Sequence, residues 1–218
     1  SLMNYTDTSI PSGYRLFAAA GTKIYDAKPS TAVEYFDGIT NSKFQHVNMT
    51  NAAGHFLVAC NGQDPVMIFD GTHWFKVATT STAQTISSIT HVSTTATLTT
   101  AVAHGLVTGN QVTISGATES NYNGTYIITV TGTTTFTYVM ASAPASDASV
   151  VGSYIITHSI TGVNSNTFIN VNVFKERLFY VEKDTMNVWY LAAKAVSGAA
   201  SKLDFGSVAK MGGYIQAM

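Results

Sequence analysis

Histidines are the first residues to consider for chemistry, because an imidazole binds metals and transfers protons near neutral pH. No two of them have the HxH or HxxxH spacing that places two metal ligands on one face. His104 directly precedes Gly105, and a turn explains that pair. We therefore predict no metal site and no bound cofactor. The six histidines are His46, His55, His73, His91, His104 and His158.

Acidic residues are the next candidates, because two carboxylates can hydrolyse a glycosidic bond. Asp64 and Asp70 are the pair least unlike such a site. Asp26, Asp37, Asp64 and Asp70 all occur near turns, where an Asp side chain accepts backbone hydrogen bonds. The GxSxG, P-loop and GxGxxG motifs are absent from the sequence. Turn formation explains the aspartates, so we predict no catalytic residue and no enzyme.

Cys60 is the single cysteine of the chain, so no internal disulfide can form. A small buried hydrophobic residue is the simplest role for it, and a reactive thiol is the alternative.

Charge and the length of apolar runs each exclude one class of partner. Charged residues make up 11% of the sequence, against roughly 25% in ordinary soluble domains. The net charge is −1, and arginine occurs only at positions 15 and 177. Nucleic-acid binding requires clustered cations that displace counterions, so we expect no such partner. No apolar run approaches the roughly 20 residues that span a bilayer, so we expect no membrane partner.

The elements that would position these residues are β-strands. Two apolar runs, 177–181 and 187–190, flank a polar turn at 182–185 and predict a β-hairpin. Residues 55–59 and 66–69, separated by Asn61-Gly62, predict a second hairpin, preceded by a run at 44–48. Residues 15–19 and 23–25 predict a third. Further strands are predicted at 33–36 and 73–77, and residues 1–13 form an arm or a first strand.

The hairpins indicate a sequence repeat. Their last aromatic residues, Tyr25 and Phe69, are 44 positions apart, whereas Phe69 and Tyr190 are 121 apart. The excess of 77 equals the length of a compositionally different segment from about 78 to 154. A period near 44 lies within the roughly 40–50 residues of a β-propeller blade. We therefore predict an all-β fold with three blade units of a partial β-propeller and an inserted small domain.

Residues 79–153 form the predicted insertion. They are rich in Thr, Ser, Ala, Val and Gly, and their only charged residues are Glu119 and Asp147. About five strands, at 85–90, 95–99, 111–115, 125–130 and 135–139, predict a small β-barrel or sandwich. Low-complexity disorder is the competing interpretation, but regular turn signals favour an ordered domain. The expected organisation is 1–78, 79–153 and 154–218, with 192–201 helical or irregular and 212–218 a strand that suggests a fragment.

Several blocks of the sequence resemble a known group of proteins. The chain is similar at 56–74, 171–183, 189–191, 198–200, 205–206 and 212–214 to the N-terminal part of tailed-bacteriophage tail hub, tail tip or packaged-DNA stabilisation proteins. The resemblance covers residues 14–77 and 155–218. It implies a β-propeller-like component of a phage or prophage virion, made in the bacterial cytoplasm. It also implies partners among other tail proteins and further copies of the chain.

The insertion resembles a different module. Residues 104–109, 112–116, 123–126 and 135–138 are similar to the small barrel called the first catalytic cysteine half-domain of ubiquitin-activating enzymes. That module also occurs inserted in phage proteins. Cys60 lies outside the segment, so the resemblance implies no ubiquitin chemistry.

Three functions follow from these expectations. The first is a structural scaffold of a virion tail, without catalysis. The alternative is a host-surface or glycan-binding module with the inserted barrel as its receptor-facing tip. A polysaccharide-degrading propeller enzyme is a third, but acidic residues are sparse. Aromatic residues could form a sugar-stacking platform or, as we expect, pack between blades: Tyr14, Tyr25, Tyr35, Trp74, Tyr180, Trp189 and Tyr190.

Overall fold

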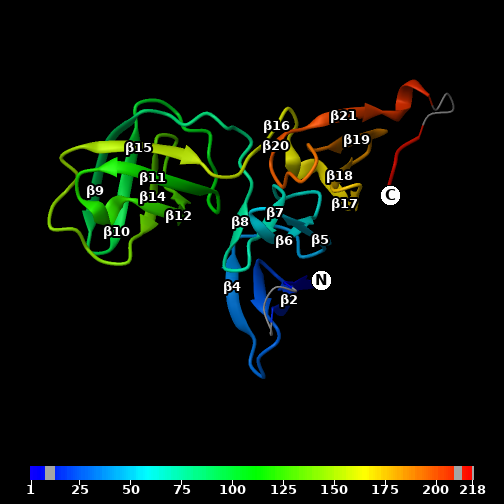
Figure 1. Ribbon diagram of the computed structural model, residues 1–218, viewed down its shortest axis with the longest axis horizontal. Helices are drawn as coiled ribbons and strands as arrows, with labels where there is room; N and C mark the ends of the chain where they lie inside the picture. Colours follow the sequence, from blue (N-terminus) through cyan, green and yellow to red (C-terminus); the bar gives the residue numbers. More distant parts are fainter. Residues whose placement is uncertain (8–12, 209–212, 218) are drawn as a thin grey trace. The chain divides into compact units, whose positions relative to one another are not determined.

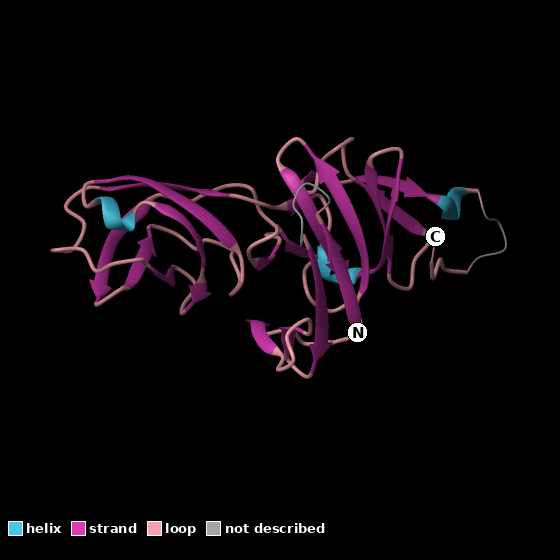
Figure 2. Cartoon of the chain, turned by 60° about the horizontal axis from the view of Figure 1, so that its bottom comes forward, coloured by secondary structure: helices cyan, strands magenta, loops and turns pink. Residues whose placement is uncertain are grey.

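The computed structural model describes residues 1–7, 13–208 and 213–217, and it has two compact units (Figure 1). The first unit comprises Ser1–Val77 with Ile160–Met218, and the second comprises Ala78–Ser159. Strands dominate both units, together with three short 3-10 turns and no α-helix in the described ranges (Figure 2). The all-β prediction is therefore confirmed.

A helix long and apolar enough to cross a membrane does not occur among the described residues.

The first unit contains three antiparallel sheets, each with four strands in a simple meander. The three predicted hairpins are confirmed as the central strand pairs of these sheets. Each sheet can be followed in Figure 1 by its colour, from blue through cyan to yellow and red. The first sheet is β1 (Leu2–Thr6), β2 (Tyr14–Ala20), β3 (Lys23–Asp26) and β4 (Val33–Asp37). The second is β5 (Gln45–Asn51), β6 (Gly54–Cys60), β7 (Met67–Phe69) and β8 (Trp74–Lys76), and the third is β17 (Phe168–Phe174), β18 (Arg177–Glu182), β19 (Asn187–Tyr190) and β21 (Ser201–Asp204).

A phenylalanine occupies the same place in all three sheets. It lies on the second strand, one position before the residue that pairs with an aromatic of the third strand. Those pairs are Ala18–Tyr25, Leu57–Phe69 and Tyr180–Trp189. The equivalent phenylalanines are Phe17, Phe56 and Phe179.

The third repeat marker was placed one residue too far along the chain. Trp189 pairs with the buried Tyr180, whereas Tyr190 pairs with Phe179 on the opposite face of the sheet. Trp189 is therefore the residue equivalent to Tyr25 and Phe69. Successive strand residues point to opposite faces, so a one-residue slip exchanges the two faces of a sheet. The spacing of aromatics alone does not fix that register.

The first and second sheets pack face to face around a shared core. We call the face toward the preceding sheet the front face and the face toward the following sheet the back face. Phe17 on the back of the first sheet meets Phe69 and Trp74 on the front of the second, with ring centroids 4.7 and 5.2 Å apart. Tyr5 meets Phe69 at 4.9 Å. The core also contains Met3, Ala19, Ile24, Ile39, Phe44, Leu57, Ala59 and Met67.

The third sheet packs on the back of the second in the same way. Strand β17 lies against β5 and β6. Tyr180 on the front of the third sheet is fully buried, and it lies near Cys60 of the second sheet. The turn after β6 also approaches β17, because the Gly62 N–H donates to the Phe168 carbonyl at 2.8 Å. Gly62 has a φ of +72°, and a Cβ there would lie 2.8 Å from Ile169 Cγ2.

Short irregular segments complete the first unit. Strand β16 (Ile160–Thr161) pairs in parallel with β20 (Gly198–Ala199), and 3-10 turns lie at η2 (Ser165–Thr167) and η3 (Phe205–Ser207). Residues 192–197 are irregular rather than helical. The strand predicted at 212–218 is wrong for residues 213–217, whose backbone hydrogen bond from the Ile215 N–H to the Thr185 carbonyl belongs to no strand ladder. Positions 212 and 218, like Pro11 and Ser12 of the N-terminal arm, lie outside the described residues.

The second unit consists of two antiparallel sheets around its own core. The five predicted strands exist, but residues 125–130 belong to two strands, because β12 pairs with β11 in one sheet and β13 pairs with β14 in the other. The expected boundary at residue 153 falls inside β15, which pairs with β11 and belongs to this unit. One sheet is β13 (Thr129–Val130), β14 (Thr135–Val139), β10 (Thr95–Thr100) and β9 (Ile86–Val92); the other is β12 (Gly124–Ile127), β11 (Gln111–Ala117) and β15 (Val151–Ile156), with η1 at Ser120–Tyr122.

The chain enters and leaves the second unit at one place. Ala78 and Ser159 form an isolated bridge, and the Ala78 N–H donates to the His158 carbonyl at 3.0 Å. Further along, Gly152 lies against β11 with a φ of +65°, and a Cβ there would lie 2.2 Å from the Ser115 carbonyl oxygen. Only glycine fits that approach of two backbones.

Candidate functional site

Asp64 belongs to a buried polar network that ties the second sheet to the segment before it. Its carboxylate accepts from Lys76 Nζ at 3.2 Å, from Asn61 Nδ2 at 2.7 Å and from the Thr40 N–H at 2.8 Å. Burial alone would raise the pKa of Asp64, but these hydrogen bonds and the Lys76 charge hold it below its usual value. Both carboxylate oxygens have structural partners, Oδ2 from Asn61 and Thr40 and Oδ1 from Lys76, so the contacts of this carboxylate are those of a structural group.

Asp70 forms a turn rather than a carboxylate pair with Asp64. Its side chain accepts from the backbone N–H groups of Thr72 and His73 at 2.9 and 2.7 Å. It borders a polar cleft of about 460 Å³ between the first and second sheets. The cleft holds an Asp7–His55 pair at 3.2 Å and the cations of Arg15 and Lys28. Arg15 is itself paired with Asp26 at 2.8 Å, so the lining of the cleft combines structural contacts of both signs.

The histidines hold loops and strands together. His104, expected in a turn, is buried there: its Nδ1 accepts from the Leu106 N–H at 3.0 Å and its Nε2 lies 3.1 Å from the Gly132 carbonyl. His91 Nδ1 lies 3.0 Å from Asp147 and 2.9 Å from the Tyr122 hydroxyl. No group of three or more His, Cys, Asp or Glu side chains arranged to hold a metal occurs in the described part of the chain.

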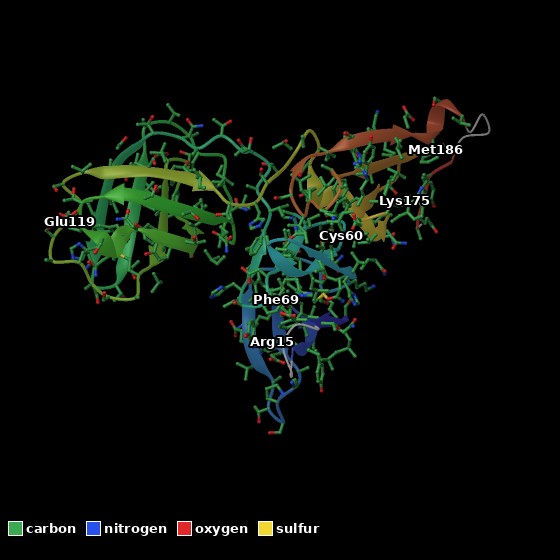
Figure 3. All side chains as sticks on the ribbon, viewed as in Figure 1. Arg15, Cys60, Phe69, Glu119, Lys175 and Met186 are labelled. Atoms are coloured by element: carbon green, nitrogen blue, oxygen red, sulfur yellow. The ribbon has the colours of Figure 1, made fainter. Side chains whose placement is uncertain are left out.

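Cys60 lies in the interior, where the second and third sheets meet (Figure 3). Burial raises the pKa of its thiol far above the usual range. The thiolate is the nucleophilic form of cysteine, so burial disfavours the form in which this side chain would react.

The aromatic residues divide between core and surface. Trp74 and Tyr180 are buried between sheets, and Tyr35 packs on Phe17. Trp189 is half-buried and donates its indole N–H to Glu182 at 2.8 Å. Tyr14 is exposed, with the Lys28 ammonium over its ring, and Tyr190 stacks on Phe179. These rings do not gather into one platform, because they belong to both faces of three different sheets.

The back face of the third sheet is an open apolar groove. It has a volume of about 290 Å³ and an almost entirely apolar lining. Phe174 is 62% exposed, Phe205 42% and Leu203 39%. Phe179 and Val188 form the floor of the groove, and Asn172 its remaining wall. Burying this surface would release free energy at about 25 cal/mol per Å² of apolar area, so the groove is suited to bind another apolar surface.

The front face of the first sheet is the other uncovered end of the stack. Leu2 is 65% exposed, while Ala18 and Tyr25 are half-buried. Lys23, paired with Glu34 at 2.5 Å and with Asp37 at 3.9 Å, lies at its margin. Both end faces therefore combine apolar centres with few charges. That pattern is typical of interaction surfaces.

The second unit has a separate surface hollow. Residues 103–106 and 130–133 line a space of about 530 Å³, mostly with apolar atoms. The larger rings of this unit are in its core, where Tyr126 and Tyr138 stack at 4.5 Å and Phe136 meets Tyr154 at 5.8 Å. Val92, Val139 and Ile155 are the large apolar side chains that it exposes most.

Sequence reasoning missed the two end faces. Neither face carries a catalytic or metal-binding motif, so residue types and spacing indicated no binding residue there. One signal was present: the triplet Arg-Leu-Phe occurs at 15–17 and again at 177–179. In the first copy Phe17 is fully buried by the second sheet, whereas in the second copy Phe179 lines an open groove. An alignment of the two triplets would have identified Phe179 as the equivalent of the core residue Phe17, whereas its open surroundings are visible only in the fold.

No protein-family model, curated protein or solved structure matches the chain.

Proposed function

We propose that the chain is a non-catalytic structural component of a phage or prophage virion tail, which acts as an assembly scaffold. In this proposal the three four-stranded sheets are blades of a β-propeller-like stack, and the second unit is a small β-barrel carried by it. The partners are other tail proteins and further copies of the chain. The sequence resemblance to tail hub, tail tip and packaged-DNA stabilisation proteins supports this setting.

One observation carries the proposal: the first unit is a stack of like sheets with an apolar face uncovered at each end. The back of the first sheet is covered by the second and the back of the second by the third, while the back of the third is open. Repeat architectures gain stability at the contacts between neighbouring units, so an uncovered end is a surface for assembly.

The chemistry of the described residues supports a mechanical role as well. Asp64 and Asp70 are engaged in structural hydrogen bonds, and the Cys60 thiol is buried. Rigid sheets that hold a second unit require shape and packing, which these residues provide.

A glycan-binding role of the second unit has weaker support. Sugar recognition uses exposed aromatic rings, whereas Tyr122, Phe136, Tyr138 and Tyr154 are all buried in this unit. Its hollow at 103–106 and 130–133 is the place where a ligand would fit. A glycan array probed with the full chain and with an Ala103→Asp variant, at an exposed position of the hollow, separates the roles: glycan signals lost in the variant would favour recognition.

The test of the scaffold proposal is the composition of particles. In cells that encode the chain, particles are induced, purified by density gradient and analysed by mass spectrometry. We expect the chain in fixed stoichiometry with tail proteins, and particles that fail to assemble tails when its gene is deleted. Intact, fully formed tails from which the chain is absent would overturn the proposal.

A further inference from the structure

We propose that the back face of the third sheet docks onto the front face of the first sheet of a second copy of this chain. The contact would repeat the two sheet-to-sheet contacts already present inside the first unit. This inference deepens the proposed function, on which it rests for its biological setting. It is tested on the purified chain, so that its failure can be told apart from a failure of the scaffold proposal.

The equivalent phenylalanines of the three sheets differ in whether a neighbouring sheet covers them. Phe17 is 0% exposed under the second sheet, and Phe56 is 6% exposed under the third. Phe179 occupies the same position on the third sheet and lines the open groove with Phe174 and Leu203. The next sheet covers this position in the first two sheets, so the groove is the place where a fourth sheet would pack.

The contacts inside the first unit show which kind of face fits the groove. Within the unit, a back face is covered each time by the front face of a sheet of the same topology, through Leu57 and Phe69 in one case and Tyr180 in the other. The equivalent front-face residues of the first sheet are Ala18 and Tyr25, with Leu2 beside them on β1. That face is the one front face in the described residues with no sheet packed on it. A second copy therefore brings the complementary surface.

The charges at the margins agree with this pairing. Arg177 lies on the back face of the third sheet, above the Tyr190 ring, and Lys175 adjoins Phe174. Glu34 and Asp37 outnumber Lys23 on the front face of the first sheet. A small excess of positive charge would meet a small excess of negative charge, which guides orientation more than it adds affinity.

The size of the faces sets the expected strength. Four strands about 4.8 Å apart and about 17 Å long give a face of roughly 300 Å². Two such faces bury less than the roughly 1,200–2,000 Å² of stable interfaces, so the isolated contact is weak. Because the two faces differ, the contact is heterologous, and it generates rings or open chains of copies rather than closed dimers.

The experiment is sedimentation velocity of the full chain from about 10 µM to about 1 mM, the range of weak affinities. We expect the average mass of the unmodified chain to rise with concentration and to pass that of a dimer. Leu2→Asp on one face and Phe174→Asp on the other each leave one face intact. Each variant alone should remain monomeric, and an equimolar mixture should form dimers and nothing larger.

Ile155→Asp, at an exposed position of the second unit, should leave the association unchanged. Circular dichroism checks that each variant is folded. Tyr14 lies on the same face as Ala18, because residues four apart on a strand share a face, so Tyr14→Ser replaces Leu2→Asp if β1 is disturbed. A chain that stays monomeric up to about 1 mM would overturn the proposal. So would a Leu2→Asp variant that still dimerises, because that result indicates two third sheets packed back to back.

Discussion

The second and third sheets of the first unit have the same four-stranded meander, yet they differ in what covers them. Both faces of the second sheet are buried, and β6, β7 and β8 are inaccessible along almost their whole length. The third sheet buries Leu178 and Tyr180 on its front face and exposes a row of apolar side chains on its back. The comparison shows that the same local fold serves as core in one repeat and as surface in the next. Position in the stack decides which.

Truncating equivalent phenylalanines is the strongest test of this comparison. Phe56→Ala should lower the free energy of unfolding by about 3–5 kcal/mol, because it leaves a cavity between two sheets. Phe179→Ala should cost about 1–2 kcal/mol, because part of that ring already contacts water. Both tryptophans, Trp74 and Trp189, lie in the first unit, so tryptophan fluorescence in a urea titration follows its unfolding. Equal costs for the two variants would contradict the comparison.

The buried network of the second sheet gives the next largest effect. Asp64→Asn should cost about 2–4 kcal/mol at pH 7, because it leaves the Lys76 ammonium without its buried carboxylate. The exposed pair between Glu176 and Lys194 is the control, and Glu176→Gln should change stability by less than about 0.5 kcal/mol.

The same carboxylate makes stability depend on pH in a defined direction. The pKa of Asp64 is lower in the folded protein than in the unfolded chain, where it is about 3.9. Its contribution is therefore complete above that value and is lost as the pH falls through the lower, folded value. Urea titrations from pH 6 down to the acid range should show a steeper loss for the unmodified chain than for Asp64→Asn. Parallel curves would show that another group controls acid unfolding.

A smaller effect, of opposite sign, is expected between the second and third sheets. The Tyr180 hydroxyl is buried with no hydrogen-bond partner in the described part of the chain. Tyr180→Phe removes that unsatisfied group and should raise the unfolding free energy by about 1 kcal/mol. Tyr122→Phe is the matched control in the second unit, where the hydroxyl donates to the Ser146 carbonyl at 2.9 Å. Circular dichroism should show that this control loses about 1 kcal/mol.

The smallest effect belongs to the open face. Phe174→Ser should change the unfolding free energy of the monomer by less than about 0.5 kcal/mol, because the ring is 62% exposed. Measured at low protein concentration, a loss above about 2 kcal/mol would show that the ring is part of the core and that the groove is not a free surface.

The sequence predicted strands far better than it predicted faces. The hairpins at 15–25, 55–69 and 177–190 follow from local signals, namely β-branched and aromatic runs bounded by turn residues. The register of the third hairpin does not follow from local signals, because Trp189 and Tyr190 are both aromatic. Only the pairing of Trp189 with Tyr180 shows which of the two lies on the buried face. The same limit applied to β15, whose residues resemble those of either unit until their pairing with β11 is known.

Candidate sites were harder to predict for a related reason. That Asp64 and Asp70 are turn residues could be inferred from their neighbours, but the partner Lys76 could not, since it is 12 positions away and reaches the carboxylate through the fold. The groove on the third sheet depends on the absence of a cover, which no short motif encodes.

The bridge between Ala78 and Ser159 has a consequence for how such a chain can change over time. The chain leaves the first unit and returns to it at adjacent residues. For the first unit, the whole insertion is therefore equivalent to one long loop. Closing a longer loop costs only about 0.6 kcal/mol for each doubling of its length. Selection can therefore exchange one inserted module for another, at a fixed point of attachment, while the three sheets keep their packing.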